Sequence, residues 1–331
     1  MSETGKTVSA GHLRGLDIAI AFWEECGLPM MREQFPEVLP LVAVGLVGPG
    51  SERYGYDDEV SRDHDFEHGF CIYLPDEESV SRRTEFLLTR AYEKLPKEFC
   101  GLRRALLNPA GGNRYGVFRT AEVYRRMTGF EGTPVGWRPF LAISDEALCE
   151  ATNGAVFYDG AGEFSAIREA WSNPPADVQR KKLCGYLIRM SQTGEYNFPR
   201  CLQRGDAAAA QLTATEFVKA SVQAFGWLHN RPSPYYKWLL RSLRDYPDAE
   251  CIEQGLRAVL TGGTAGIGAA SGSEAAEAIA RVCAEMLRKV RETMPECAGA
   301  ENLQQAAMAL NDKVADGVLR SMSPLAAVSG S

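Results

Sequence analysis

Residues 41–74 read LVAVGLVGPGSERYGYDDEVSRDHDFEHGFCIYL, and their pattern predicts two strands joined by a long loop. The apolar run at 41–47 predicts a buried strand, and residues 66–74 predict a second one. Between them lie a glycine-serine turn, Gly50–Ser51, and, after an eleven-residue gap, Asp63 and Asp65. The first strand is therefore expected to lead into a loop, and the second to carry two carboxylates.

The alternation of strand side chains gives this pattern a chemical meaning. Successive residues point to opposite faces, so Asp63 and Asp65 are expected on one face and His64 on the other. Magnesium prefers one or two carboxylates completed by water and substrate phosphates. Gly50 lets the backbone approach a ligand, and the Ser51 hydroxyl can donate to a phosphate oxygen. An isolated aspartate pair would instead indicate a solvated turn, but the whole constellation predicts a site for a metal-bound triphosphate.

The same residues resemble a known signature. Gly50–Ser51, the gap and residues 63–65 are similar to the motif of the polymerase-beta-like nucleotidyltransferase superfamily. Their flanks resemble an uncharacterised bacterial family of nucleotidyltransferase-like proteins with a helical second domain. Arg200, residues 204–206 (RGD) and residues 234–238 (PYYKW) resemble motifs of that second domain, so the likeness covers roughly residues 10–250.

The resemblance implies metal-dependent transfer of a nucleoside monophosphate from a nucleoside triphosphate, with release of pyrophosphate. Asp63 and Asp65 would bind Mg²⁺, with two ions expected, and the metal would hold the attacking and leaving oxygens in line. Gly50, Ser51 and Arg53 would bind the triphosphate. The expected acceptor is a hydroxyl of a small molecule, because two-domain enzymes of similar architecture modify aminoglycosides. A protein or tRNA acceptor remains an alternative.

The second domain is expected to complete the active site. Tyr236 and Lys237 place a ring and a cation at an expected helix start, which suits a triphosphate or a stacked base. The alternative is that these aromatic residues pack a helix end. Arg204 would clamp phosphate, since a guanidinium binds oxyanions in a bidentate manner. Asp206 is a candidate catalytic base and equally a candidate helix N-cap.

A third carboxylate is where the sequence departs from the family pattern. Related enzymes usually supply one from a later strand, and the strand expected near residues 115–120 carries Arg119 in its place. Glu122 and Asp145 are the alternatives. Without a third acid, the chain would be a catalytically degenerate module that binds nucleotides, regulates a partner or acts like an antitoxin.

A second glycine-rich string, TGGTAGIG at residues 261–268, resembles the cofactor fingerprint of short-chain dehydrogenases, with 257–260 as a possible preceding strand. Such a fingerprint should open a doubly wound domain and be followed by a Tyr-x-x-x-Lys pair. Only 63 residues follow Gly268, and none is tyrosine. We therefore expect an interhelical loop.

The expected fold class is α+β, with two domains. Residues 1–145 would form a small mixed-sheet nucleotidyltransferase domain, and residues 146–331 an α-helical bundle. Within the second part, helices are expected at 177–193, 206–230 and 234–245, and a loop at 157–160.

Bulk properties set limits on partners and location. The net charge of −7 argues against broad binding to nucleic acid or to anionic membranes. Nine scattered cysteines without a Cys-x-x-Cys pair indicate reduced thiols and a cytoplasmic protein. No apolar stretch approaches the roughly 20 residues that a membrane span needs.

Overall fold

The computed structural model describes residues 14–60, 67–105, 107–108, 112–262 and 269–328, with backbone only for 269–273. The chain divides into two compact units, which we describe separately. The first comprises Met1–Thr133 and Glu150–Trp171, and the second comprises Pro134–Cys149 and Ser172–Ser331. The chain thus passes between the units three times, whereas the sequence predicts a single boundary after residue 145.

A four-stranded mixed sheet forms the centre of the first unit, in the strand order β5-β2-β1-β6. Strand β1 pairs antiparallel with β2 and β6, and β2 pairs parallel with β5. All residues of β1 and β2 are buried, as their continuous apolar character requires. The α+β class and the small mixed sheet are therefore confirmed. The strands are β1 (Ala43–Leu46), β2 (Cys71–Leu74), β5 (Gly116–Arg119) and β6 (Ala155–Asp159).

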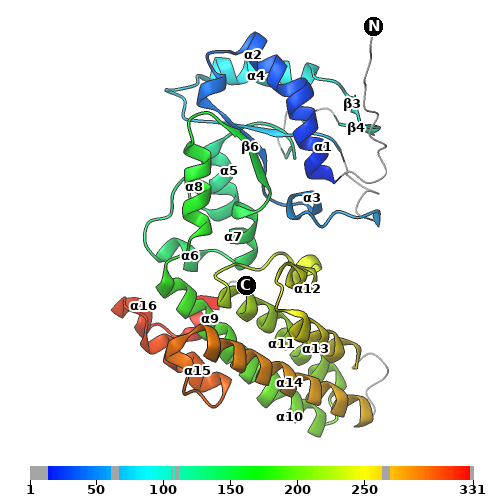
Figure 1. The fold of residues 1–331 in the computed structure, drawn as a ribbon, viewed down its shortest axis with the longest axis vertical. Coiled ribbons are helices and arrows are strands. Elements are labelled where there is room, and N and C mark those ends of the chain that lie inside the picture. The colour runs from blue at the N-terminus through cyan, green and yellow to red at the C-terminus, as the bar shows by residue number, and fades with distance from the viewer. Residues whose placement is uncertain (1–13, 61–66, 106, 109–111, 263–268, 329–331) are drawn as a thin grey trace. The chain divides into compact units, whose positions relative to one another are not determined.

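Helices cover both faces of this sheet (Figure 1). On one face, Tyr73 stacks on Phe164 at 4.1 Å between ring centroids. On the other, Phe70 contacts Tyr92 at 5.1 Å and Trp23 at 5.4 Å. The face that carries Phe70 is covered by α1 (Gly15–Phe22), the π-helical η1 (Trp23–Gly27), α2 (Leu28–Gln34) and α4 (Arg82–Lys94), which contains Tyr92. The face that carries Tyr73 is covered by α5 (Thr120–Thr128) and α8 (Glu163–Ser172), which contains Phe164. A small hairpin joins β3 (Glu98–Phe99) to β4 (Leu102–Arg103).

One expectation for this unit is wrong, and another concerns residues that lie outside the described part of the chain. The loop expected at 157–160 is wrong, because most of it belongs to β6, where Tyr158 pairs with Val44. Asp159 and Gly160 lie at the end of this strand, where the Asp159 carboxylate accepts from the backbone N–H groups of Gly162 and Ser165 around the start of α8. Strand β2 begins at Cys71, and Asp63, His64 and Asp65 lie outside the described residues.

The second unit is helical. Helix α11 runs through its centre and is buried along most of its length, packing on α9 and α13. Helix α9 also packs on α15, and α13 on α14. The helices of this unit are α6 (Arg138–Ala142), α9 (Ala176–Met190), the π-helical η4 (Ser191–Asn197), α10 (Phe198–Gln203), α11 (Ala207–Leu228), η5 (Tyr236–Trp238), α12 (Leu239–Ser242), η6 (Leu243–Asp245), α13 (Glu250–Thr261), α14 (Ala269–Thr293), η7 (Pro295–Cys297), α15 (Leu303–Asp312), α16 (Gly317–Ser321) and η8 (Pro324–Val328). Helix α7 (Asp145–Thr152) spans the crossing at residue 149.

The dehydrogenase interpretation fails at its first element. Residues 257–260, the possible strand before the glycine-rich string, belong to helix α13. The string itself is outside the described residues from 263 to 268. Within the described residues, no helix combines the length and apolar character that a membrane span requires.

Candidate functional site

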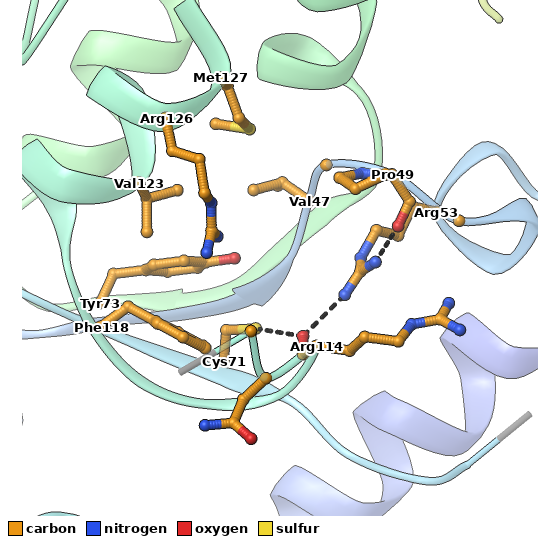
Figure 2. A pocket seen from close by; sticks show the side chains of 14 residues that line it. Val47, Pro49, Arg53, Cys71, Tyr73, Arg114, Phe118, Val123, Arg126 and Met127 are labelled. Atoms are coloured by element: carbon orange, nitrogen blue, oxygen red, sulfur yellow. Dashed lines mark hydrogen bonds between the residues drawn. The ribbon is translucent and has the colours of Figure 1, made fainter. Parts of the chain in front are cut away.

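A cavity of about 520 Å³ lies on the α5 side of the sheet, where the turn after β1 meets β2, β5 and α5 (Figure 2). Three arginines contribute to its wall: Arg53, Arg114 and Arg126. The rest of the wall is glycine turn, neutral polar groups and apolar side chains, chiefly Val47, Tyr73, Phe118, Val123 and Met127. Among the described residues that line the cavity, none is acidic. The cavity is thus suited to an anion that also carries an apolar part.

Two glycines form the turn at the edge of this cavity. Gly48 has φ 101° and Gly50 has φ 139°, conformations that only glycine adopts without strain. A Cβ atom at Gly50 would also lie 2.6 Å from a carboxylate oxygen of Glu52. Ser51 begins the short helix α3 (Ser51–Tyr54) and is not among the residues lining the cavity. Of the predicted turn residues, the structure therefore places Gly50, but not Ser51, in the wall.

Arg53 holds the turn together from inside. Its side chain is buried, and it donates to the carbonyl oxygen of Pro49 and, at 2.9 Å, to that of Arg114. The Glu52 carboxylate lies 3.6 Å from its guanidinium. Burial lowers the pKa of Arg53, but Glu52 and other neighbours raise it, and the net shift is upward. Arg53 therefore stays charged, while its Nε atom has no hydrogen-bond partner among the described residues.

The other two arginines differ in how they are engaged. Arg114 donates to Glu52 at 2.9 Å, so two arginines share this one carboxylate. Arg126 extends from α5 toward the Tyr73 ring, with its guanidinium carbon 5.7 Å from the Phe118 ring centroid (Figure 2). No ion pair joins Arg126 to an acid among the described residues. Arg126 is the cation best placed to meet a ligand.

Strand β2 presents two neutral groups to the same space. Cys71 and Tyr73 are two residues apart and line the cavity together. Burial raises the pKa of the Cys71 thiol and that of the Tyr73 hydroxyl. Both groups are therefore protonated at neutral pH and leave the positive charge of the arginines in place.

The candidates for a third carboxylate are placed elsewhere. Strand β5 contributes Phe118 to the cavity, while Arg119 points away and binds Glu85 at 2.6 Å. Glu122 is exposed on α5 and does not line the cavity. Asp145 belongs to the second unit, where its carboxylate is buried and takes part in a hydrogen-bond network. Strand β5 therefore contributes no acidic residue to the described cavity wall.

Four predicted residues lie in the second unit, and the structure does not bring them to one point. Arg204 precedes α11 and Lys237 follows it, and the 22 residues of α11 span about 33 Å at 1.5 Å per residue. The N–H of Arg231 donates to the Gly226 carbonyl at 2.9 Å, which keeps the following chain at that end of the helix. Arg204 thus lies just before the start of α11, and Lys237 lies in the segment that follows its end.

The local roles of these residues are mainly structural or surface roles. Asp206 caps α11, its carboxylate accepting from the N–H of Ala209 at 2.9 Å. Tyr236 is 71% exposed and its ring lies 4.2 Å from that of Tyr235. The ammonium of Lys237 lies 5.0 Å from the Trp238 ring.

The described residues do not form a complete magnesium site. No group of three His, Cys, Asp or Glu residues there could hold a metal ion, and the cavity wall carries no carboxylate. Asp63 and Asp65 are outside the described residues. The expected metal thus rests on the sequence pattern.

Comparison with known proteins gives one match. Residues 140–239 match a family described as a domain of unknown function, DUF4037. No curated protein and no solved structure matches the chain. The matched segment contains α7, β6, the helices from α8 to α11 and η5, but not the glycine turn or the aspartates. It is consistent with the expected likeness to an uncharacterised family, and it does not extend to the nucleotidyltransferase signature.

Proposed function

We propose that the first unit binds a nucleoside triphosphate in the arginine-lined cavity and that the protein transfers its nucleoside monophosphate to a hydroxyl of a small molecule. The observation that supports this most is the meeting of a glycine turn with Arg53, Arg114 and Arg126 in one wall. Guanidinium groups bind phosphate oxygens strongly, and glycines let the backbone approach them. The rings of Phe118 and Tyr73 offer an apolar surface to the base or the sugar.

In the proposed reaction, the acceptor oxygen bonds to the α-phosphorus while the bond from that phosphorus to the pyrophosphate oxygen breaks. The acceptor proton is released, and pyrophosphate leaves with the bonding electrons. Arg126 would neutralise phosphate charge, and Arg53 would keep the turn in shape. Mg²⁺ held by Asp63 and Asp65 would supply further charge neutralisation when bound.

A second candidate is a module that binds a nucleotide without turnover. It is favoured by the composition of the described wall, where β5 supplies Phe118 and no described residue supplies an acid. Such a module would share the cavity and the arginines but not the chemistry.

Binding and turnover separate these two functions. Purified protein is titrated with fluorescent N-methylanthraniloyl-ATP and its GTP analogue, and pyrophosphate release is followed with each NTP, Mg²⁺ and a small-molecule extract. Arg126→Ala is compared with Arg125→Ala, since Arg125 is the neighbouring arginine on α5 but pairs with Glu131 at the surface. We expect Arg126→Ala to weaken binding at least tenfold and Arg125→Ala to leave it within twofold.

Asp63→Asn and Asp65→Asn then report on the chemistry. Loss of pyrophosphate release in both variants supports the transferase. Binding by the wild type without release, across all acceptors, favours the binding module. Absence of binding to either nucleotide analogue would refute both candidates.

A further inference from the structure

The glycine turn of the cavity is held by a side chain from a distant part of the sequence. The N–H of Gly48 donates to Oδ1 of Asn153 at 2.8 Å, and Nδ2 of Asn153 donates back to the Gly48 carbonyl at 2.7 Å. The two residues are 105 positions apart, and both belong to the first unit. The amide side chain thus engages both hydrogen-bonding groups of one residue in the cavity wall.

A second residue fixes Asn153 itself. Nη2 of Arg168, on α8, lies within hydrogen-bonding distance of three successive carbonyl oxygens, those of Thr152 at 2.8 Å, Asn153 at 3.1 Å and Gly154 at 3.0 Å. Gly154 has φ 66°, and a Cβ atom there would collide with the Leu46 carbonyl at the end of β1. The turn at 152–154 is therefore tightly fitted against β1.

From this arrangement we infer that Asn153 is a positioning residue for the ligand of the cavity, and that Arg168 acts through it. A turn containing Gly48 and Gly50 has many accessible conformations, and ordering it upon binding would cost conformational entropy. The β1–β6 pairing ends at Leu46 and Ala155, so it does not hold Gly48. Asn153 fixes the peptide groups of Gly48 before any ligand binds. Preorganisation of this kind increases affinity without a new ligand contact.

The ligand class in this inference rests on the proposed function, but the positioning itself does not. Two measurements keep them apart. The first is the affinity for N-methylanthraniloyl-ATP, with inorganic tripolyphosphate as competitor. The second is amide hydrogen exchange of the peptide covering residues 44–54 without any ligand.

The decisive variants are Asn153→Ala, which removes both hydrogen bonds, and Asn153→Asp, which keeps the acceptor but loses the donor when ionised. The matched control is Ser81→Ala, which removes the N-cap of α4 in the same unit. We expect about a tenfold loss of probe affinity for Asn153→Ala, corresponding to one or two hydrogen bonds. Ser81→Ala should bind within twofold of the wild type.

A pH profile distinguishes positioning from general destabilisation. A protonated aspartic acid can both donate to and accept from Gly48, so the affinity of Asn153→Asp relative to wild type should recover as pH falls from 7.5 toward 5. In this variant the Gly48 carbonyl would raise the pKa of the new carboxyl, whereas the Gly48 N–H and Arg168 would lower it. The affinity of Asn153→Ala relative to wild type should stay constant across the same range.

Several results would overturn the inference. These are binding of Asn153→Ala within twofold of wild type, an equal loss in Ser81→Ala, or a flat relative profile for Asn153→Asp. If the wild type does not bind the probe, the proposed function fails. Hydrogen exchange is then the only test of whether Asn153 positions the glycine turn. Exchange at residues 44–54 must then be faster in Asn153→Ala than in Ser81→Ala.

Discussion

Replacing Asp145 by alanine tests the interior of the helical unit. Its carboxylate accepts hydrogen bonds from Lys182 at 3.1 Å, from Tyr186 at 2.8 Å and from the indole of Trp227 at 2.7 Å. All four residues are at most 2% exposed. Removing the carboxylate leaves a buried ammonium group without its counter-charge and removes the acceptor of two buried donors.

The expected cost follows from these contacts. Breaking a buried ion pair by removing one partner typically costs about 3–5 kcal/mol. Each buried donor left unsatisfied adds roughly 1–3 kcal/mol, although the cavity can admit water and the costs are not additive. We therefore expect Asp145→Ala to lower the free energy of unfolding by about 4 kcal/mol, a large part of the roughly 5–15 kcal/mol typical of a folded protein.

The assay is urea unfolding followed by circular dichroism, with hydrogen exchange in α9 and α11 to locate the loss in the second unit. Asp245→Ala is the matched control, because Asp245 pairs with Arg241 at the surface of the same unit. It should change stability by less than about 1 kcal/mol. In Asp145→Ala/Lys182→Met the stranded charge is gone, so part of the stability should return. The reasoning is refuted if Asp145→Ala lies within about 1 kcal/mol of wild type, or if removing the charge of Lys182 restores nothing.

Three further predictions concern the first unit. Burial lowers the pKa of His68 below its usual 6.5, so the unfolded chain binds the proton more tightly and stability should fall as pH drops below about 6.5. His68→Phe should reduce this dependence of the urea midpoint between pH 5.5 and 7.5, and the part that stays includes His229, whose pKa burial also lowers. Gly50→Ala should lower the melting temperature and abolish probe binding, because its φ of 139° strains any other residue by roughly 1–3 kcal/mol. Arg104→Lys should cost about 2 kcal/mol in urea unfolding despite the retained charge, because an ammonium cannot reproduce the guanidinium fork that binds the carbonyls of Tyr92, Leu95 and Pro96; an unchanged midpoint would contradict this.

Elements with strong local signals could be predicted from the sequence. The apolar run at 41–47 became β1, and the helix expected at 206–230 is α11. Strand β6 could not be predicted in this way. Its residues become a strand by pairing with β1 more than 100 positions earlier, and the Asp-Gly pair at its end indicates a turn. The loop expected at 157–160 was wrong because tertiary pairing decided the conformation.

The candidate site shows the same division. The glycine turn carries a local motif, and the structure places Gly48 and Gly50 in the cavity wall. Arg126 has no motif, yet a signal was present, because Val123, Arg126 and Met127 follow the helical spacing of one face. Arg114 and Asn153 carry no comparable signal, since each reaches the site from a loop whose position depends on the rest of the fold.

The long sequence separation between β1 and β6 affects when the sheet can be completed during synthesis. Strand β1 emerges from the ribosome more than 100 residues before β6, the edge strand that pairs with it in the native sheet. Until β6 has been made, the backbone N–H and C=O groups on that side of β1 lack their native partner strand. A fragment ending at residue 133 or 145 would keep that edge uncovered, and we expect it to associate with itself. A fragment cut to the matched residues 140–239 would carry β6 without β1. None of these fragments contains both β1 and β6, so none can form the complete four-stranded sheet.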